Sequence, residues 1–457
     1  MGDDPLNDSL ERKIANREAR VCVIGLGYVG LPLAVELARV GFAVTGLDTD
    51  SARVGALARG ESYIADVAEA DLRAVVQSGR LRATWDYAAL DDADVIFICV
   101  PTPFTATRSP DLSFVLSAAR GIAAHLRPGR LVVLQSTTYP GTTEDEVLPI
   151  LETSGLEAGV DFHLAFSPER INPGDRQHTV RSTPKVVGGL TPRCAELAAL
   201  VLAQLHPSVH VVSSPRAAEM TKLLENIFRS VNIALVNEIA LLCERMGIDV
   251  WEVIEAASTK PFGFMPFYPG PGVGGHCIPV DPYYLLWKAR EYDFHTKFIE
   301  LAAEVNQEMP YHVVERIAEA LNAQGKTMRG ARILLLGVAF KKDVDDARNS
   351  PAERIAELLL AKGANLEYND PYIPRFSVGG DVFYPTRVVM ESTPLTRETL
   401  QETDCAVILA AHSAYDFAWI VAEAPLVVDA VNATRGVGAD AGNVWRIGAP
   451  GIGRAHG

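Results

Sequence analysis

One segment of the sequence combines a thiol, several glycines and an acid. It reads GPGVGGHCIPVDP over residues 270–282 and contains Cys277, with Asp281 four residues later. Glycines let a backbone and a ligand approach closely, and a helix expected to start near residues 281–282 would stabilise a thiolate. A thiolate can attack an aldehyde, and hydride loss from the adduct gives a thioester that water cleaves. The segment therefore predicts oxidation through to the acid, with Cys277 as the nucleophile.

The alternative is that Cys277 is structural, since a lone cysteine in a glycine loop often is. The adjacent His276 suggests a Cys–His dyad, but neighbouring side chains diverge along most backbones, so we do not expect one. The other five cysteines lie in apolar strand-like or helical runs and show neither CxxC pairs nor zinc-ligand spacing: Cys22, Cys99, Cys194, Cys243 and Cys405. We expect no metal site and no disulfide framework.

Two polar residues lie one helical turn apart in an otherwise apolar pattern, Lys222 and Asn226. The spacing of four projects both from the same helix face. We expect Lys222 to stabilise developing oxyanions, and Asn226 to hold the reacting hydroxyl or its water. Burying a lysine is unfavourable unless it is paired or functional. The alternative is a salt bridge from Lys222 to Glu219 or Glu225.

The residues that would position this chemistry begin with a glycine-rich turn. Residues 20–50 contain an apolar strand, the turn GLGYVG, a helical apolar pattern, and a second strand that ends in Asp48. This context predicts a dinucleotide-binding βαβ unit, with the pyrophosphate at the helix N-terminus. An acid at this distance favours NAD over NADP. The turn residues expected to contact NAD are Gly25, Gly27, Tyr28, Val29 and Gly30. A glycine turn in a nucleotide-free domain is the alternative.

Three further strands are expected at residues 93–100, 130–136 and 162–167. In open α/β sheets ligands bind beyond the carboxyl ends of the strands, so the junctions that follow are candidate site walls. Thr137 and Glu169 lie in two of them, and Glu169 is the nearest candidate to assist a water in thioester hydrolysis. The alternative is that both junctions are ordinary strand-to-helix turns.

A long helix is expected over residues 216–257, apolar on more than one face and therefore buried between partners. This pattern predicts a homodimer or higher homo-oligomer. A second α/β unit follows, with strands at 331–340, 405–411 and 426–430 and a helix at 351–363. Its first turn lacks GxGxxG but carries the basic residues Lys341, Lys342 and Arg348, and Arg435 follows its last strand. Two nucleotide-type units suggest NAD and a nucleotide conjugate as the two ligands.

The predicted fold class is α/β, with two Rossmann-like doubly wound domains joined by a long central helix. We expect an NAD-binding domain at 1–212, a central helical dimerisation domain carrying the cysteine loop at 213–312, and a second nucleotide-binding domain, for the nucleotide conjugate, at 313–457. A chain of 457 residues is too long for one core. Its net charge of −15 argues against a nucleic-acid partner. With neither an apolar leader nor a run of about 20 apolar residues, we expect no membrane segment and a cytoplasmic protein.

The motifs resemble those of the UDP-glucose/GDP-mannose dehydrogenase superfamily in order along nearly the whole chain. They are GLGYVGLP (25–32), VPTP (100–103), STTYPGTT (136–143), SPERINPG (167–174), AAEMTKLLEN (217–226), GPGVGGHCIPVDP (270–282) and GVAFKKDVDDARNSP (337–351). The resemblance implies an enzyme that oxidises C6 of a nucleotide sugar to a carboxylate, uses two NAD and passes through a cysteine thioester.

The resemblance also assigns roles to residues. It implies a catalytic set of Cys277, Lys222, Asn226, Asp281, Glu169 and Thr137. It adds as NAD contacts Asp48, Arg53, Thr102, Thr137 and Arg348. To the nucleotide-sugar pocket it assigns Glu169, Arg170, Lys222, Asn226, Gly274, Phe340, Lys341 and Arg435.

The segment around the thiol departs from the glucose-type pattern, which has FGGSC followed by Lys-Asp. Here GGHC and Val280-Asp281-Pro282 are similar to the branch that acts on UDP-N-acetylhexosamines. Residues 260–272 and 281–306 look most like UDP-N-acetylglucosamine 6-dehydrogenases, so UDP-N-acetylglucosamine is the expected substrate. UDP-glucose and UDP-N-acetylmannosamine are the alternatives. A protein that kept the fold but only senses nucleotide sugars is an alternative of a different class.

Overall fold

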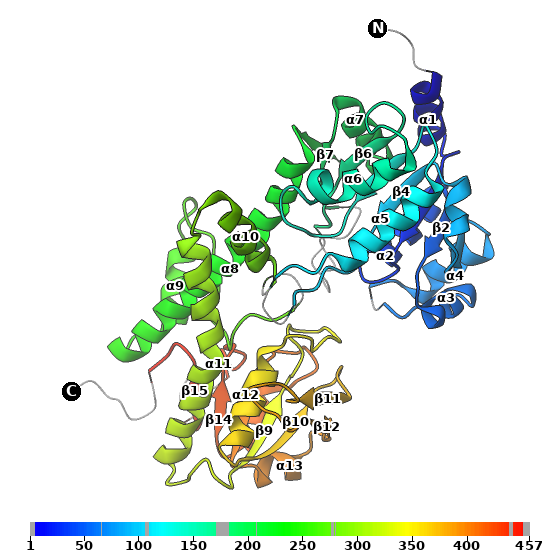
Figure 1. Cartoon of the computed structure of the whole chain (residues 1–457). Helices are drawn as coiled ribbons and strands as arrows, with labels where there is room; N and C mark the ends of the chain where they lie inside the picture. The colour runs from blue at the N-terminus through cyan, green and yellow to red at the C-terminus, as the bar shows by residue number, and fades with distance from the viewer. Residues whose placement is uncertain are drawn as a thin grey trace. The chain divides into compact units, whose positions relative to one another are not determined.

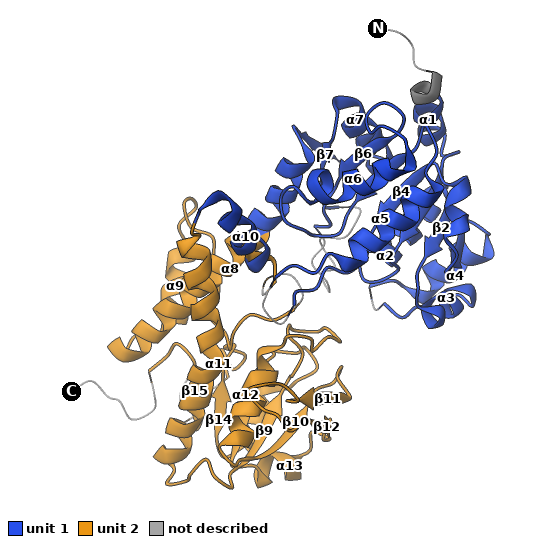
Figure 2. Ribbon diagram, viewed as in Figure 1, with its two compact units in different colours: residues 1–225, 283–294 blue, residues 226–282, 295–457 orange. Residues whose placement is uncertain are grey.

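The computed structural model describes residues 5–64, 66–105, 109–170, 182–206, 208–275, 278, 280–437 and 442–450. The chain forms two compact units, coloured separately in Figure 2. Unit 1 contains residues 1–225 and 283–294, and unit 2 contains residues 226–282 and 295–457. The three domain limits expected from the sequence remain predictions.

Unit 1 is built on an eight-stranded sheet in the order β3-β2-β1-β4-β5-β6-β7-β8 (Figure 1). Its first six strands are parallel and follow the order of a dinucleotide-binding fold. β7 pairs antiparallel with β6, and β8 pairs parallel with β7. The strands are β1 Arg20–Ile24, β2 Ala43–Leu47, β3 Leu81–Thr84, β4 Val95–Ile98, β5 Leu131–Leu134, β6 His163–Phe166, β7 Lys185–Gly189 and β8 Val209–Val212.

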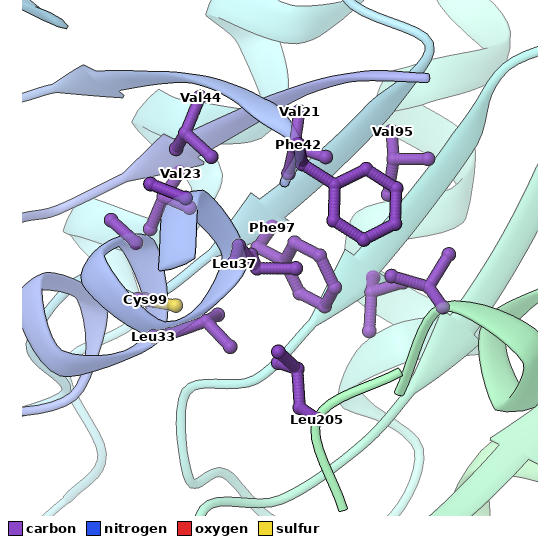
Figure 3. Close-up of a cluster of buried hydrophobic side chains, with 14 of the residues drawn as sticks. Val21, Val23, Leu33, Leu37, Phe42, Val44, Val95, Phe97, Cys99 and Leu205 are labelled. Atoms are coloured by element: carbon purple, nitrogen blue, oxygen red, sulfur yellow. The ribbon is translucent and has the colours of Figure 1, made fainter. Parts of the chain in front are cut away.

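Helices cover both faces of this sheet because its central strands are apolar on both sides. In β1, Val21 and Val23 join the cluster packed against α2, which Figure 3 shows, whereas Cys22 and Ile24 face α5. The helices of unit 1 are α1 Pro5–Ala15, α2 Gly30–Val40, α3 Ser51–Ala58, α4 Glu69–Gln77, α5 Ser113–His125, α6 Leu148–Leu151 and α7 Pro192–Leu202, to which most of α10 (Asp281–Ala289) is added.

The expected long helix is two helices, α8 Pro215–Met246 and α9 Val250–Ser258. The prediction of one helix over 216–257 was therefore wrong. Gly247 takes a left-handed conformation with φ of 73°, and Asp249 then caps α9 by accepting a hydrogen bond from the Trp251 amide. α8 leaves unit 1 after Glu225, and α9 and α11 (Lys297–Ala323) belong to unit 2.

Unit 2 contains a parallel five-stranded sheet in the order β10-β9-β13-β14-β15 and a hairpin of β11 and β12. The expected strand 331–340 ends at Leu336, because Gly337 turns the chain with φ of 80°. The strands are β9 Arg332–Leu336, β10 Asn365–Asn369, β11 Arg375–Val378, β12 Val388–Glu391, β13 Cys405–Ile408, β14 Val427–Asp429 and β15 Val444–Arg446. The flanking helices are α12 Pro351–Ala361, α13 Arg397–Glu402 and α14 Phe417–Glu423.

The fold class expected from the sequence, α/β with two Rossmann-like units and a long central helix, is confirmed. In the described part of the chain, α8 alone is long and apolar enough to cross a membrane by length and composition. This is weak evidence, since core helices of soluble proteins pass the same test. Apolar stretches of this length were not expected from the sequence.

Candidate active site

The turn after β1 has the geometry of a pyrophosphate site. Gly25 is left-handed, with φ of 90°, and a Cβ there would lie 2.7 Å from the carbonyl oxygen of Cys99. A Cβ on Gly30, where α2 begins, would lie 1.8 Å from the carbonyl oxygen of Gly25. A Cβ on Gly27 would meet no protein atom within 4 Å. Packing thus requires glycine at 25 and 30, whereas Gly27 leaves open the space where the pyrophosphate of a dinucleotide lies.

Asp48, directly after β2, is buried against this turn. Its carboxylate accepts hydrogen bonds from the amides of Leu26 at 2.8 Å and Asp50 at 2.9 Å. Arg53 approaches the same carboxylate to 3.4 Å. The predicted cofactor residues 25–30, Asp48 and Arg53 therefore form one cluster. These residues fit NAD, because an acid at the end of the second strand suits a ribose hydroxyl.

The loops after β4 and β5 are joined to each other. The Thr102 hydroxyl donates to the carbonyl of Thr137 at 2.7 Å, and the Ser136 hydroxyl donates to the carbonyl of Val100 at the same distance. The Tyr284 hydroxyl on α10 donates to the Thr102 carbonyl. Thr102 and Thr137, predicted separately from two motifs, thus lie together at the carboxyl edge of the sheet.

Glu169, after β6, is held by the first residue of β7, the residue after β5 and the amide of its own neighbour. Its Oε2 atom accepts from Lys185 Nζ at 2.8 Å and from Gln135 Nε2 at 3.0 Å, and its Oε1 atom accepts from the Arg170 amide at 2.7 Å. The Arg170 guanidinium pairs with Glu225 at 2.6 Å. Sequence reasoning missed Lys185 and Gln135. The available signal was a lysine that opens the wholly buried strand KVVGG.

Lys222 is 6% exposed on α8, and it has no hydrogen bond or ion pair with any residue that the structure describes. Glu225 pairs with Arg170 instead. Glu219 accepts from the amides of Gly141 and Thr143 and from the Thr143 hydroxyl. Burial raises the pKa of Glu219, and these hydrogen bonds oppose the shift. The alternative reading of Lys222, a salt bridge to Glu219 or Glu225, was therefore wrong.

Asn226 and Asp281 lie together in unit 2. Both are buried, and the Asn226 amide donates to the Asp281 carboxylate while its oxygen accepts from Arg229. Asp281 is the first residue of α10, as the expected helix start required. The pair joins α8 to the residues that follow the predicted nucleophile.

The glycine loop before the nucleophile is fixed on unit 2. The Gly270 amide donates to Asn237 at 3.0 Å, and Asn237 in turn donates to Asn306 on α11. A Cβ on Gly274 would lie 2.8 Å from the Cβ of Phe340. The Asn349 side chain donates to the carbonyl of Gly275 at 3.2 Å. Gly274 and Phe340, both predicted to line the sugar pocket, are thus in contact distance.

Two predicted arginines are engaged in exposed ion pairs. Arg348 makes a bidentate pair with Asp346 at 2.8 and 2.9 Å, and Arg435 pairs with Glu255 on α9 at 2.5 Å. Lys341 is half-buried beside Phe340 in sequence, at the turn after β9. To bind a phosphate, each arginine has to give up its ion pair with the neighbouring carboxylate. The loss is small, because a solvent-exposed ion pair contributes little to stability.

Cys277 and His276 lie outside the described residues, so the role of Cys277 as the nucleophile stays a prediction. The five cysteines that the structure describes are all buried free thiols. Burial raises the pKa of Cys22 and Cys405 to about 12, and it raises the pKa of Cys99 further. Such thiols are poor nucleophiles. The expectation that Cys22, Cys99 and Cys405 belong to the core is confirmed.

A glycine turn with room for a pyrophosphate in unit 1, and a second Rossmann-like unit in the same chain, are features of a nicotinamide-dependent dehydrogenase that binds two nucleotides. Three matches identify the family. Residues 19–206, 216–308 and 334–436 match the NAD binding, central and UDP binding domains of the UDP-glucose/GDP-mannose dehydrogenase family. The chain belongs to this family, and it is an NAD-dependent UDP-sugar dehydrogenase.

Similar proteins act on different UDP-sugars. A UDP-N-acetyl-D-glucosamine 6-dehydrogenase of Pseudomonas aeruginosa is 40% identical over 78% of this chain and 84% of its own length. A UDP-N-acetyl-D-mannosamine dehydrogenase of Escherichia coli K12 is 40% identical over 75% and 82%. The structure of a UDP-D-ManNAc dehydrogenase from Pyrococcus horikoshii superposes with a TM-score of 0.83 at 32% identity, covering 94% of this chain and 99% of that one.

Proposed function

We propose that the protein oxidises C6 of UDP-N-acetylglucosamine to the carboxylate through a thioester on Cys277. The glycine turn at residues 25–30 and Asp48 would hold NAD, which would supply the hydride acceptor for both oxidations. The observation that carries the thioester route is the anchoring of described residues on both sides of Cys277 in the sequence. Asn237 and Asn349 hold Gly270 and Gly275, which precede Cys277. Asn226 on α8 holds the buried Asp281, which follows Cys277 by four residues.

The proposed roles follow from charge and burial. Lys222 is a buried cation without a partner among the described residues, so it is suited to stabilise an oxyanion at C6. The Cys277 thiolate attacks the C6 aldehyde, and loss of hydride from the adduct leaves the thioester. Water then adds its oxygen to C6 while Glu169 accepts its proton, the C6–S bond breaks, and the thiolate leaves. Thr137 and Thr102 line the same edge of the sheet.

The remaining proposed contacts divide between the two nucleotides. For NAD they are Gly25, Gly27, Tyr28, Val29, Gly30, Asp48, Arg53 and Arg348. For the UDP-sugar they are Arg170, Gly274, Phe340, Lys341 and Arg435. We further propose that the protein is cytoplasmic, which the five free thiols among the described cysteines support.

We also propose a homodimer or larger homo-oligomer that forms through α8. Five apolar side chains recur on this helix at spacings of seven, four, three and four, and each is at least 37% exposed: Phe228, Leu235, Ile239, Leu242 and Met246. A stripe with this period suits packing against a second helix.

The substrate is tested by incubating the enzyme with NAD and UDP-N-acetylglucosamine, UDP-N-acetylmannosamine or UDP-glucose. Because similar proteins are named for the first two, those two form the decisive comparison. We expect two NADH per sugar, and the mass of the uronic acid, with the highest kcat/KM for UDP-N-acetylglucosamine. Turnover confined to either other sugar would show that the proposed substrate is wrong.

A further inference from the structure

Lys185 is a fully buried cation at the carboxyl edge of the unit 1 sheet. It is 1% exposed, and its ammonium lies 2.8 Å from Oε2 of Glu169 and 3.1 Å from the carbonyl of Pro168. An isolated buried ammonium is strongly unfavourable, so the lysine belongs with the carboxylate that it contacts.

The position of Lys185 follows from one reversed strand. Parallel strands bring their last residues to the ligand-binding edge, but β7 runs antiparallel to β6. The first residue of β7 therefore lies where β6 ends, beside the segment that carries Glu169. The Gln135 amide approaches the same Oε2 atom from the end of β5, and the Cys99 thiol donates to the Gln135 oxygen at 3.6 Å.

The charged and titratable groups around Glu169 in the described part of unit 1 are few. Lys185 faces it from β7, and Arg170 adjoins it with its guanidinium committed to Glu225. The Cys99 thiol follows β4, and burial raises its pKa, so it stays neutral. The Lys185 ammonium is thus a full positive charge in direct contact with the Glu169 side chain.

We infer that Lys185 is a positioning residue for thioester hydrolysis, which holds the Glu169 carboxylate ionised and in place to accept the proton of the attacking water. The inference rests on the proposed function, in which Glu169 accepts the proton of that water. A largely buried carboxylate without a cation is driven towards its neutral form, and a protonated Glu169 cannot accept a proton. Lys185 itself touches neither sugar nor water in this role.

The test measures thioester hydrolysis against pH in Lys185→Met, which keeps the length of the side chain and removes its charge. On the acidic side of the pH profile the hydrolysis rate falls as Glu169 becomes protonated, and we call this part the acid limb. Without the ammonium, the midpoint of the acid limb should shift to higher pH by about one unit or more. We expect hydrolysis at pH 7 to slow by about tenfold or more, with recovery towards the wild-type rate as pH rises. Intact-protein mass spectrometry would then detect the accumulated acyl adduct.

Three further variants separate the possible causes. Lys185→Arg keeps the charge and should leave the acid limb in place. Lys13→Met removes a 2.7 Å ion pair with Asp94 in the same unit, away from the carboxyl edge, and should leave hydrolysis unchanged. Combining Lys185→Met with Glu169→Gln should be no slower than Glu169→Gln alone, because both act through one carboxylate.

The outcomes distinguish this inference from the function on which it rests. If Glu169→Gln hydrolyses the thioester at the wild-type rate, the proposed role of Glu169 is wrong. If Glu169→Gln accumulates the adduct while Lys185→Met keeps an unshifted acid limb, only the inference about Lys185 is overturned. If Lys185→Met does not fold, the pH profile of Lys185→Arg is the deciding measurement. An acid limb shifted from its wild-type position overturns the inference, and an unshifted acid limb supports it.

Discussion

The residues that flank Cys277 in sequence are anchored by buried amide groups. On one side Asn237 accepts from the Gly270 amide and donates to Asn306, and on the other side Asn226 donates to Asp281. Buried polar groups that satisfy one another in this way fix a single conformation, because any other leaves them unpaired. These contacts hold Gly270 and Asp281, which lie on either side of the predicted nucleophile in the sequence.

This arrangement predicts a sharp difference between cysteine variants. Cys277→Ala should form no uronic acid, because without a thiolate the second oxidation has no covalent adduct to start from. NADH per sugar should fall from two to at most one, measured by absorbance with product mass analysis. Cys243→Ala, which removes a buried thiol on α8, should keep two. Two NADH per sugar from Cys277→Ala would contradict the thioester route.

At the scale of elements, the same turn is built twice. In unit 1 the Gly25 amide donates to the carbonyl at the end of β2, and Asp48 accepts from Leu26. In unit 2 the Gly337 amide donates to the last carbonyl of β10, and Asp370 accepts from the amides of Val338 and Ala339. In both units an acid after the second strand secures the turn after the first.

Asp370 makes this turn in unit 2 sensitive to acid. Burial alone would raise its pKa, but hydrogen bonds from His412 and from the amides of Tyr372 and Ala339 outweigh burial, and the pKa lies below its usual value. A lowered pKa means that the ionised carboxylate stabilises the fold above the unfolded pKa of about 4. That contribution is lost as pH falls through the folded pKa.

We therefore expect Asp370→Asn to destabilise unit 2 at pH 7 by about 1–3 kcal/mol, because the asparagine NH2 group cannot accept and at least two donors lose an acceptor, such as the amides of Tyr372 and Ile373. Below about pH 4 the difference from wild type should begin to shrink, because the carboxyl of the unfolded wild-type chain then takes up a proton, and it should continue to shrink until the pH has fallen through the lower folded pKa. Calorimetric Tm values across this pH range measure both effects. Asp345→Asn, at an exposed position, is the matched control and should shift stability by less than about 0.5 kcal/mol. A difference that stays constant into acid would contradict the argument.

The sequence was informative wherever local chemistry decides the structure. Gly25, Gly27 and Gly30 could be assigned because a tight turn with an open face needs glycine at fixed spacing. The break between α8 and α9 was missed because a single glycine, Gly247, interrupts an otherwise continuous apolar pattern. Lys185 was missed because an antiparallel pairing depends on residues distant in sequence, and no local pattern encodes it.

At the scale of the whole molecule, the exposed apolar stripe on α8 carries the proposal of an oligomer. Leu235 is the second of the five stripe residues along the helix and is 55% exposed in the single chain. A glutamate there would place a charge in a desolvated interface, which opposes association. Leu235→Glu should therefore convert the oligomer to a monomer, measured by size-exclusion chromatography with light scattering.

The matched control is Val389→Glu on β12, because Val389 is also 55% exposed but lies outside the stripe. It should leave the molar mass unchanged. A wild-type protein that elutes as a monomer would count against the proposal directly. So would a Leu235→Glu variant that keeps the wild-type mass.

The return of the chain to unit 1 at residues 283–294 has a consequence for synthesis. α10 supplies Trp287, whose ring lies 4.9 Å from that of Tyr139, and Tyr284, which donates to the Thr102 carbonyl. Domains generally fold as units while the chain emerges from the ribosome. Here α8, α9 and the cysteine loop are translated before α10, so unit 1 lacks its last helix until they have been made. The nascent chain therefore completes unit 1 only after the segment that contains residue 277 has been made.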